Sequence, residues 1–195
     1  GAPLPLQDHA RRSLRSAILM KRAEARLNEA VLAEGLTPAP LATRIGINTG
    51  DMVVGNMGTE KKMNYTMMGD AVNLAARLEA GSKQYGVYTM LSQYVLDNEF
   101  TDATGQTRKV RDLVETRFID RLTVVGKSEP VEVYELCAMK GDLTAQEQEL
   151  LPLFAEAMGH YQRMEWDQAI AKFERADKIE RIPDGATTHS RGFIK

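Results

Sequence analysis

Residues 64–79 read NYTMMGDAVNLAARLE, in which a short polar strand, a glycine turn and an amphipathic helix follow one another directly. Asn73 and Arg77 are four residues apart in this helix, so their side chains share one helical face. A helix N-terminus favours anions, and arginine carries a permanent charge on a fork of donors. The pattern indicates a phosphate site, although Asn and Arg on an exposed helix are more often simply solvated.

The residues before this stretch show a helical pattern and then a strand pattern. A helix is expected over 8–34, where apolar clusters at 14–18 and 27–31 repeat with helical spacing. Alternating apolar residues and a Gly-Asp turn then predict a β-hairpin over 41–54.

A loop, a strand and a helix are expected next. Residues 55–62 contain two glycines and the charged run TEKK, which indicate a flexible loop. A strand is expected over 63–68, and the helix begins at Asp70 as its N-cap and ends at about Gly81. These glycines match neither GxGxxG nor the Walker pattern, so they do not support a phosphate loop.

The middle of the chain predicts further short elements. A strand is expected over 87–91, a helix over 92–96 and an exposed polar connection over 102–115. Two β-rich runs, 118–125 and 131–136, predict a second hairpin.

The end of the chain has a purely helical character. Residues 141–182 predict a helical hairpin that resembles one tetratricopeptide-type unit. One such repeat cannot bury its apolar face alone, so it either packs on the preceding domain or begins an array. Residues 183–195 are expected to form a mobile tail.

Composition limits the possible partners. The 195 residues suffice for one domain with a small appendage, and a net charge of −2 gives no global attraction to nucleic acid. The single cysteine, Cys137, excludes an intrachain disulfide and suits a reducing compartment. No run of eighteen apolar residues occurs, so we expect no membrane contact by this segment and a cytoplasmic location, with an anchor elsewhere in a longer product still possible.

Together with RIGINTGDMVVGNMG at 44–58, the stretch at 64–79 closely resembles the later half of the catalytic domain of class III nucleotidyl cyclases. The resemblance implies an α+β, ferredoxin-like domain over 1–140 that lacks its first strands and is followed by the α-helical hairpin. The GAPLP opening resembles the linker after a lost strand, so a fragment is expected. Its exposed apolar faces and open strand edges would then need another chain to cover them.

The resemblance also implies residue roles. Asn73 matches the asparagine that orients the ribose, and Arg77 matches the arginine that neutralises the pentavalent phosphorus. Thr66 occupies the purine-selecting position, where a hydroxyl can accept from adenine and lacks the carboxylate that pairs with guanine. Lys127 matches a lysine that meets the triphosphate, although GKS alone reads as a solvated turn.

The activity implied is that of an adenylate cyclase, which converts ATP to cyclic AMP and pyrophosphate. The expected cofactor is Mg²⁺ or Mn²⁺, with its aspartate ligands in a missing upstream segment and no metal ligand within this chain. The expected partner is a second cyclase domain in a head-to-tail homodimer, and the chain alone should be inactive. Alternatives are a guanylate cyclase, a catalytically inactive regulatory or dimerisation module, and a helical interaction protein. The form NYTMMG also suggests bicarbonate sensitivity.

Overall fold

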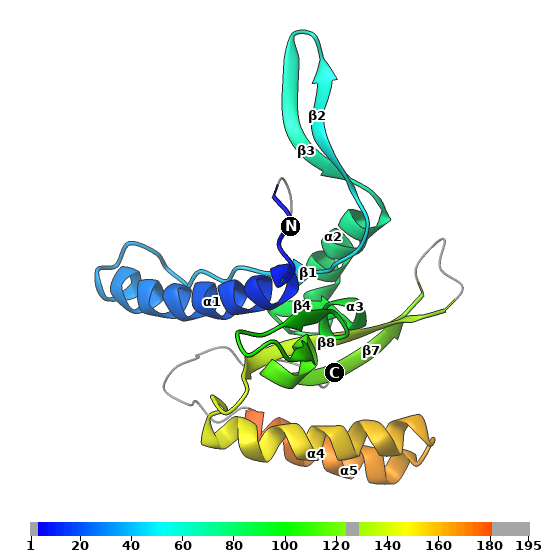
Figure 1. The fold of residues 1–195 in the computed structure, drawn as a ribbon. Coiled ribbons are helices and arrows are strands. Elements are labelled where there is room, and N and C mark those ends of the chain that lie inside the picture. The colour runs from blue at the N-terminus through cyan, green and yellow to red at the C-terminus, as the bar shows by residue number, and fades with distance from the viewer. Residues whose placement is uncertain (1–3, 124–128, 181–195) are drawn as a thin grey trace.

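The computed structural model of the protein describes residues 4–123 and 129–180, which form a mixed four-stranded β-sheet with helices, a projecting hairpin, a second small two-stranded sheet and a terminal pair of helices (Figure 1). The helices are α1 (His9–Ala33), α2 (Asp70–Ser82), α3 (Gln93–Leu96), the 3-10 helix η1 (Val110–Leu113), α4 (Ala145–Gln162) and α5 (Trp166–Glu180). The strands are β1 (Ile45–Ile47), β2 (Val53–Thr59), β3 (Lys62–Met68), β4 (Thr89–Ser92), β5 (Glu99–Thr101), β6 (Thr107–Lys109), β7 (Val114–Leu122) and β8 (Val131–Met139). The α+β class expected from the resemblance is confirmed.

The main sheet has four strands in the order β1-β4-β8-β7. β1 pairs parallel with β4, whereas β4–β8 and β7–β8 are antiparallel. The hairpin predicted over 41–54 is therefore wrong, since the chain leaves the sheet after β1, and β1 pairs with residues 89–91, which come much later in the sequence. A parallel pair requires a crossover, which in this fold consists of β2, β3 and α2. The hairpin predicted over 118–136 is confirmed as β7 and β8.

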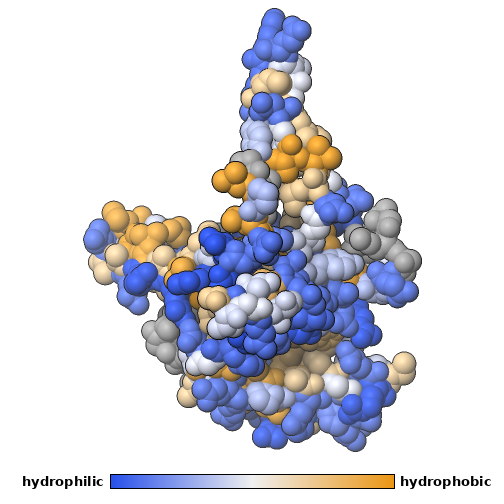
Figure 2. Space-filling view, viewed as in Figure 1, coloured by the Kyte–Doolittle hydropathy of each residue, from blue (hydrophilic) through white to orange (hydrophobic). Residues whose placement is uncertain are grey.

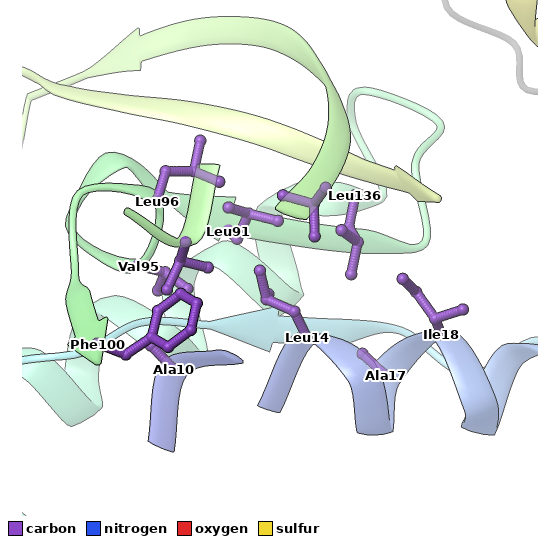
Figure 3. Packing of buried hydrophobic residues seen from close by; sticks show 11 residues of the cluster. Ala10, Leu14, Ala17, Ile18, Leu91, Val95, Leu96, Phe100 and Leu136 are labelled. Carbon is purple, nitrogen blue, oxygen red and sulfur yellow. The ribbon is translucent and has the colours of Figure 1, made fainter. Parts of the chain in front are cut away.

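The helices α1 and α2 pack on opposite faces of this sheet. Neighbouring residues of a strand point to opposite faces, and in β4 Leu91 contributes to the cluster of α1 while Met90 contributes to that of α2. Figure 3 shows the first cluster, in which Leu14 and Ile18 of α1 lie beneath Leu136 and its neighbours.

Only the first half of α1 is buried in this core. The predicted cluster at 14–18 is confirmed, but that at 27–31 is not buried, and Leu27 is 49% exposed. The reason is visible in Figure 1, where the second half of α1 extends beyond the sheet. Figure 2 shows hydrophobic surface at that end. The exposed apolar surface expected from the sequence is therefore present.

The segment predicted as a flexible loop over 55–62 is instead part of a regular hairpin. β2 pairs with β3 from Val53↔Met68 to Thr59↔Lys62, so only two residues form the turn. Gly58 has a φ of 149°, and a Cβ there would lie 2.1 Å from the Lys62 backbone oxygen. Glycine at this position thus permits close approach of the two strands and does not indicate mobility.

Two smaller expectations also need correction. The connection predicted over 102–115 contains β6, η1 and the start of β7, because Val110 and Val114 are buried in the α1 cluster. The N-cap of α2 is Gly69, so the predicted cap Asp70 is the first helical residue.

The terminal helices pack on the domain, which is one of the two alternatives stated for the helical hairpin. Phe154 of α4 lies beneath the Arg117 guanidinium of β7, with 4.7 Å between the Cζ atom and the ring centroid. Arg117 also donates to Glu135 of β8 at 2.9 Å and to Glu180 of α5 at 3.0 Å. The proposed domain boundary near 140 stays a prediction, and the tail at 183–195 lies outside the described residues.

No helix within residues 4–123 and 129–180 combines the length and the apolar character needed to cross a lipid bilayer.

Candidate functional site

The exposed face of α2 carries the two polar residues singled out by the sequence. Asn73 and Arg77 are both exposed, whereas Leu74 and Leu78, each one residue further on, are buried. The buried pair anchors α2 on the sheet and leaves the neighbouring face of the helix to solvent. The structure therefore brings Asn73 and Arg77 together on one accessible surface.

Glycine at the N-cap shapes the start of α2. Gly69 has a φ of 145°, and a Cβ there would lie 3.3 Å from the Asp51 backbone oxygen. Its own carbonyl accepts from the amides of Val72 and Asn73, both at 3.1 Å. This tight junction takes the chain from β3 into the helix without an intervening loop.

A second glycine lets α2 approach the sheet. A Cβ on Gly46 of β1 would lie 2.2 Å from the Ala75 backbone oxygen and 2.5 Å from the Glu79 amide nitrogen. Both obstacles are backbone atoms of a helix, which cannot rotate away as a side chain can. Any larger residue at this position would have to displace α2.

Thr66 lies on β3 opposite Gly55 of β2 and is half-buried, three residues before the N-cap of α2. Thr66, Asn73 and Arg77 thus belong to one continuous strand–turn–helix unit at the base of the projecting hairpin (Figure 1).

The side chains of Asn73 and Arg77 on α2 are available to a ligand. Within residues 4–123 and 129–180, Asn73 makes no side-chain hydrogen bond and Arg77 has neither a side-chain hydrogen bond nor an ion pair. An unpaired guanidinium beside an amide can donate several hydrogen bonds to phosphate oxygens and can also neutralise their charge. The arrangement suits a phosphorylated ligand.

Two further expectations concern groups beyond this unit. Lys127 lies at 124–128, outside the described residues, so its proposed role stays a prediction. Among the described residues, no group of three or more His, Cys, Asp or Glu side chains is placed to hold a metal ion.

Sequence reasoning missed the apolar surface of the β2–β3 hairpin. Its exposed large side chains are Val53, Met63, Tyr65, Met67 and Met68. Figure 2 shows hydrophobic residues near the base of this projection, with a hydrophilic tip. The alternation of Met63, Tyr65 and Met67 was the available signal, but glycines and charges in the preceding segment favoured a loop.

Residues 1–127 match the family described as "Adenylate and Guanylate cyclase catalytic domain". The terminal-differentiation specific adenylate cyclase of Dictyostelium discoideum is 33% identical over 146 residues, which are 74% of this chain and 6% of that protein. Overall, the chain spans between 6% and 24% of the length of three curated adenylate cyclases that it matches.

Two solved structures share the fold. The adenylyl cyclase CyaB from P. aeruginosa is 29% identical, with a TM-score of 0.57 over 74% of this chain and 67% of that one. The guanylyl cyclase Cya2 is 30% identical, with the same TM-score over 74% of this chain and 66% of that one. The two neighbours differ in the base that their names imply, so the fold alone leaves the choice of purine open.

Proposed function

The chain belongs to the adenylate and guanylate cyclase catalytic domain family, and on that basis we propose that it supplies the purine and transition-state side of an adenylate cyclase site. The observation that carries the proposal is the exposed face of α2, where Arg77 lacks an ion partner among the described residues and lies one turn from Asn73. The proposed reaction converts ATP to 3',5'-cyclic AMP and pyrophosphate in a cytoplasmic setting.

Arg77 is proposed to act on the reacting phosphorus. The ribose 3'-oxygen forms a bond to the α-phosphorus, the bond from that phosphorus to the oxygen that bridges it to the β-phosphorus breaks to release pyrophosphate, and the 3'-hydroxyl proton is taken up by water. Negative charge accumulates on the pentavalent phosphorus and the departing pyrophosphate. A guanidinium that meets this charge stabilises the transition state more than bound ATP, which raises turnover.

The neighbouring residues are proposed to orient the nucleotide. Asn73 carries a donor and an acceptor, which suit the ribose and its ring oxygen. The Thr66 hydroxyl accepts from the adenine amino group, and the lack of a carboxylate at this position disfavours guanine. Lys127 is proposed to meet the triphosphate.

Mg²⁺ or Mn²⁺ is the expected cofactor, and it would neutralise triphosphate charge when bound. The described residues offer no matching cluster of ligands, so its ligands are proposed to come from elsewhere.

The exposed apolar side chains of the β2–β3 hairpin support the proposal that a second cyclase domain is the partner. Tyr65 is 61% exposed and Met67 is 52% exposed on a projection that packs on little of its own chain (Figure 1). Large exposed apolar side chains on one surface are typical of an interface. We propose that they contact a second copy in a head-to-tail dimer, so Tyr65→Ser/Met67→Ser should weaken self-association in sedimentation velocity.

The function is tested on the complete encoded polypeptide with ATP and GTP in parallel. Arg77→Ala should lower kcat by about 10²–10³-fold with a much smaller change in KM. Arg26→Ala is the matched control, because Arg26 is an exposed helical arginine on α1 and should leave both constants unchanged. A loss for Arg77→Ala that lies in KM alone would contradict the assigned role, and faster turnover of GTP would contradict the choice of adenine.

A further inference from the structure

The loop that follows β1 is tied to three other elements by side-chain hydrogen bonds. Asn48 Nδ2 donates to the Ala71 carbonyl in the first turn of α2 at 2.9 Å. Asn48 Oδ1 accepts from the hydroxyl of Ser92, the last residue of β4, at 2.5 Å. The next residue, Thr49, is joined through its Oγ1 to His9 Nε2 of α1 at 2.9 Å.

The Asn48 amide is held in one orientation. Ser92 is fully buried, and its hydroxyl fixes the amide oxygen of Asn48, so the amide nitrogen points to α2. Asn48 follows β1 directly, and Ser92 ends β4, which is the parallel neighbour of β1. The amide is thus supported by the sheet, which is the rigid part of the domain.

The hydrogen bond from Asn48 to the Ala71 carbonyl complements the close contact between Gly46 and α2. Gly46 sets how closely the middle of α2 approaches the sheet, at Ala75 and Glu79. Asn48 holds the helix one turn earlier, at Ala71. Ala71 and Ala75 are four residues apart and lie on one side of α2, so contacts at both restrain the helix axis and also its rotation, and with it the direction of the face that carries Asn73 and Arg77.

We propose that Asn48 is a positioning residue, which holds α2 through Ala71 and so places Asn73 and Arg77 for the reaction. The effect expected on turnover rests on the proposed function. The restraint of α2 by Asn48 does not, because it concerns only the packing of that helix. Asn48 acts through the helix and needs no contact with the substrate.

Hydrogen exchange of the α2 backbone amides tests whether Asn48 restrains α2, and it requires no measurement of enzyme activity. Asn48→Ala should increase exchange of the first turns of α2 by about fivefold, the effect of one lost hydrogen bond. Asn28→Ala is the matched control, since Asn28 also makes two hydrogen bonds, both to the backbone of Leu41, at 2.8 and 2.7 Å. Asn28→Ala should leave the hydrogen-exchange rates of the α2 amides equal to those of the unmodified protein.

Kinetics test the link to the reaction. Asn48→Ala should lower kcat on the order of 10–100-fold with little change in KM, the cost of misplacing a group by about 1 Å. In the Arg77→Ala background the same change should lower kcat by a clearly smaller factor, because one of the two groups that it positions is already gone and only Asn73 remains. If Asn48→Ala does not fold, Ser92→Ala removes only the hydroxyl that orients the amide and should act in the same direction with a smaller effect.

Two results would overturn the proposal. The first is that the α2 amides of the Asn48→Ala and Ser92→Ala variants exchange no faster than those of Asn28→Ala. The second is a kcat loss for Asn48→Ala that is as large in the Arg77→Ala background as in the unmodified protein, which would show that Asn48 acts independently of Arg77. If the unmodified polypeptide makes no cyclic AMP, the proposed function fails, while the exchange experiment still decides whether Asn48 holds α2.

Discussion

Replacement of Arg117 should uncouple the terminal helices from the sheet. Its side chain is only 1% exposed and pairs with Glu135, 4% exposed, and with Glu180, 7% exposed. Glu135 belongs to the sheet and Glu180 ends α5, so one guanidinium joins the two parts of the structure. Arg117→Met keeps most of the volume but leaves two carboxylates buried without their cation.

The expected cost follows from that burial. Breaking a buried ion pair by removing one partner costs about 3–5 kcal/mol, because the remaining charge is left desolvated. For a chain of this size each kcal/mol lowers Tm by about 2–4 °C. Arg117→Met should therefore lower Tm by roughly 6–20 °C, and the cation–π contact with Phe154 is lost as well.

Calorimetry with a matched variant measures this effect. Arg121 lies on the same strand and pairs with Glu132, but its side chain is 59% exposed, so Arg121→Met should cost at most about 1 kcal/mol. The triple change Arg117→Met/Glu135→Leu/Glu180→Leu should recover much of the loss, because no charge is then buried. Equal Tm values for Arg117→Met and Arg121→Met would refute the reasoning.

Three further predictions concern other parts of the fold. Gly46→Ala should destabilise the protein by about 1–3 kcal/mol in urea unfolding, because the new Cβ meets the backbone of α2; an unchanged midpoint would contradict that close approach. Burial and a hydrogen bond to Asp120 raise the pKa of Tyr85 to about 12. The unfolded tyrosine ionises near pH 10 and so loses its proton first; stability should fall as pH rises from about 10 to 12, and Tyr85→Phe should flatten that fall in Tm, whereas parallel curves would disprove the assignment. Thr144→Ala removes the cap of α4 and should cost about 1 kcal/mol in thermal unfolding; an unchanged Tm would show that the cap does not stabilise the helix.

Local signals predicted those elements whose partners are close in the chain. The α2 helix, the β7–β8 hairpin and the terminal helical hairpin are predictable because periodicity and turns are properties of neighbouring residues. The parallel pair β1–β4 is not, since nothing near 45–47 specifies a partner at 89–91. The second half of α1 has the apolar spacing of a buried helix and is nevertheless exposed, because burial depends on where the sheet ends.

For the candidate site, the sequence by itself determined that Asn73 and Arg77 share one face of a helix, since four residues complete about one turn. It also determined the family, through residues 44–58 and 64–79. Only the tertiary structure decided that this face stays exposed, that Gly46 lets α2 approach the sheet and that Asn48 bonds to its first turn. The physical reason is that both contacts join α2 to a strand and loop well before it in the chain, and such contacts exist only once β1, β4 and α2 have packed together.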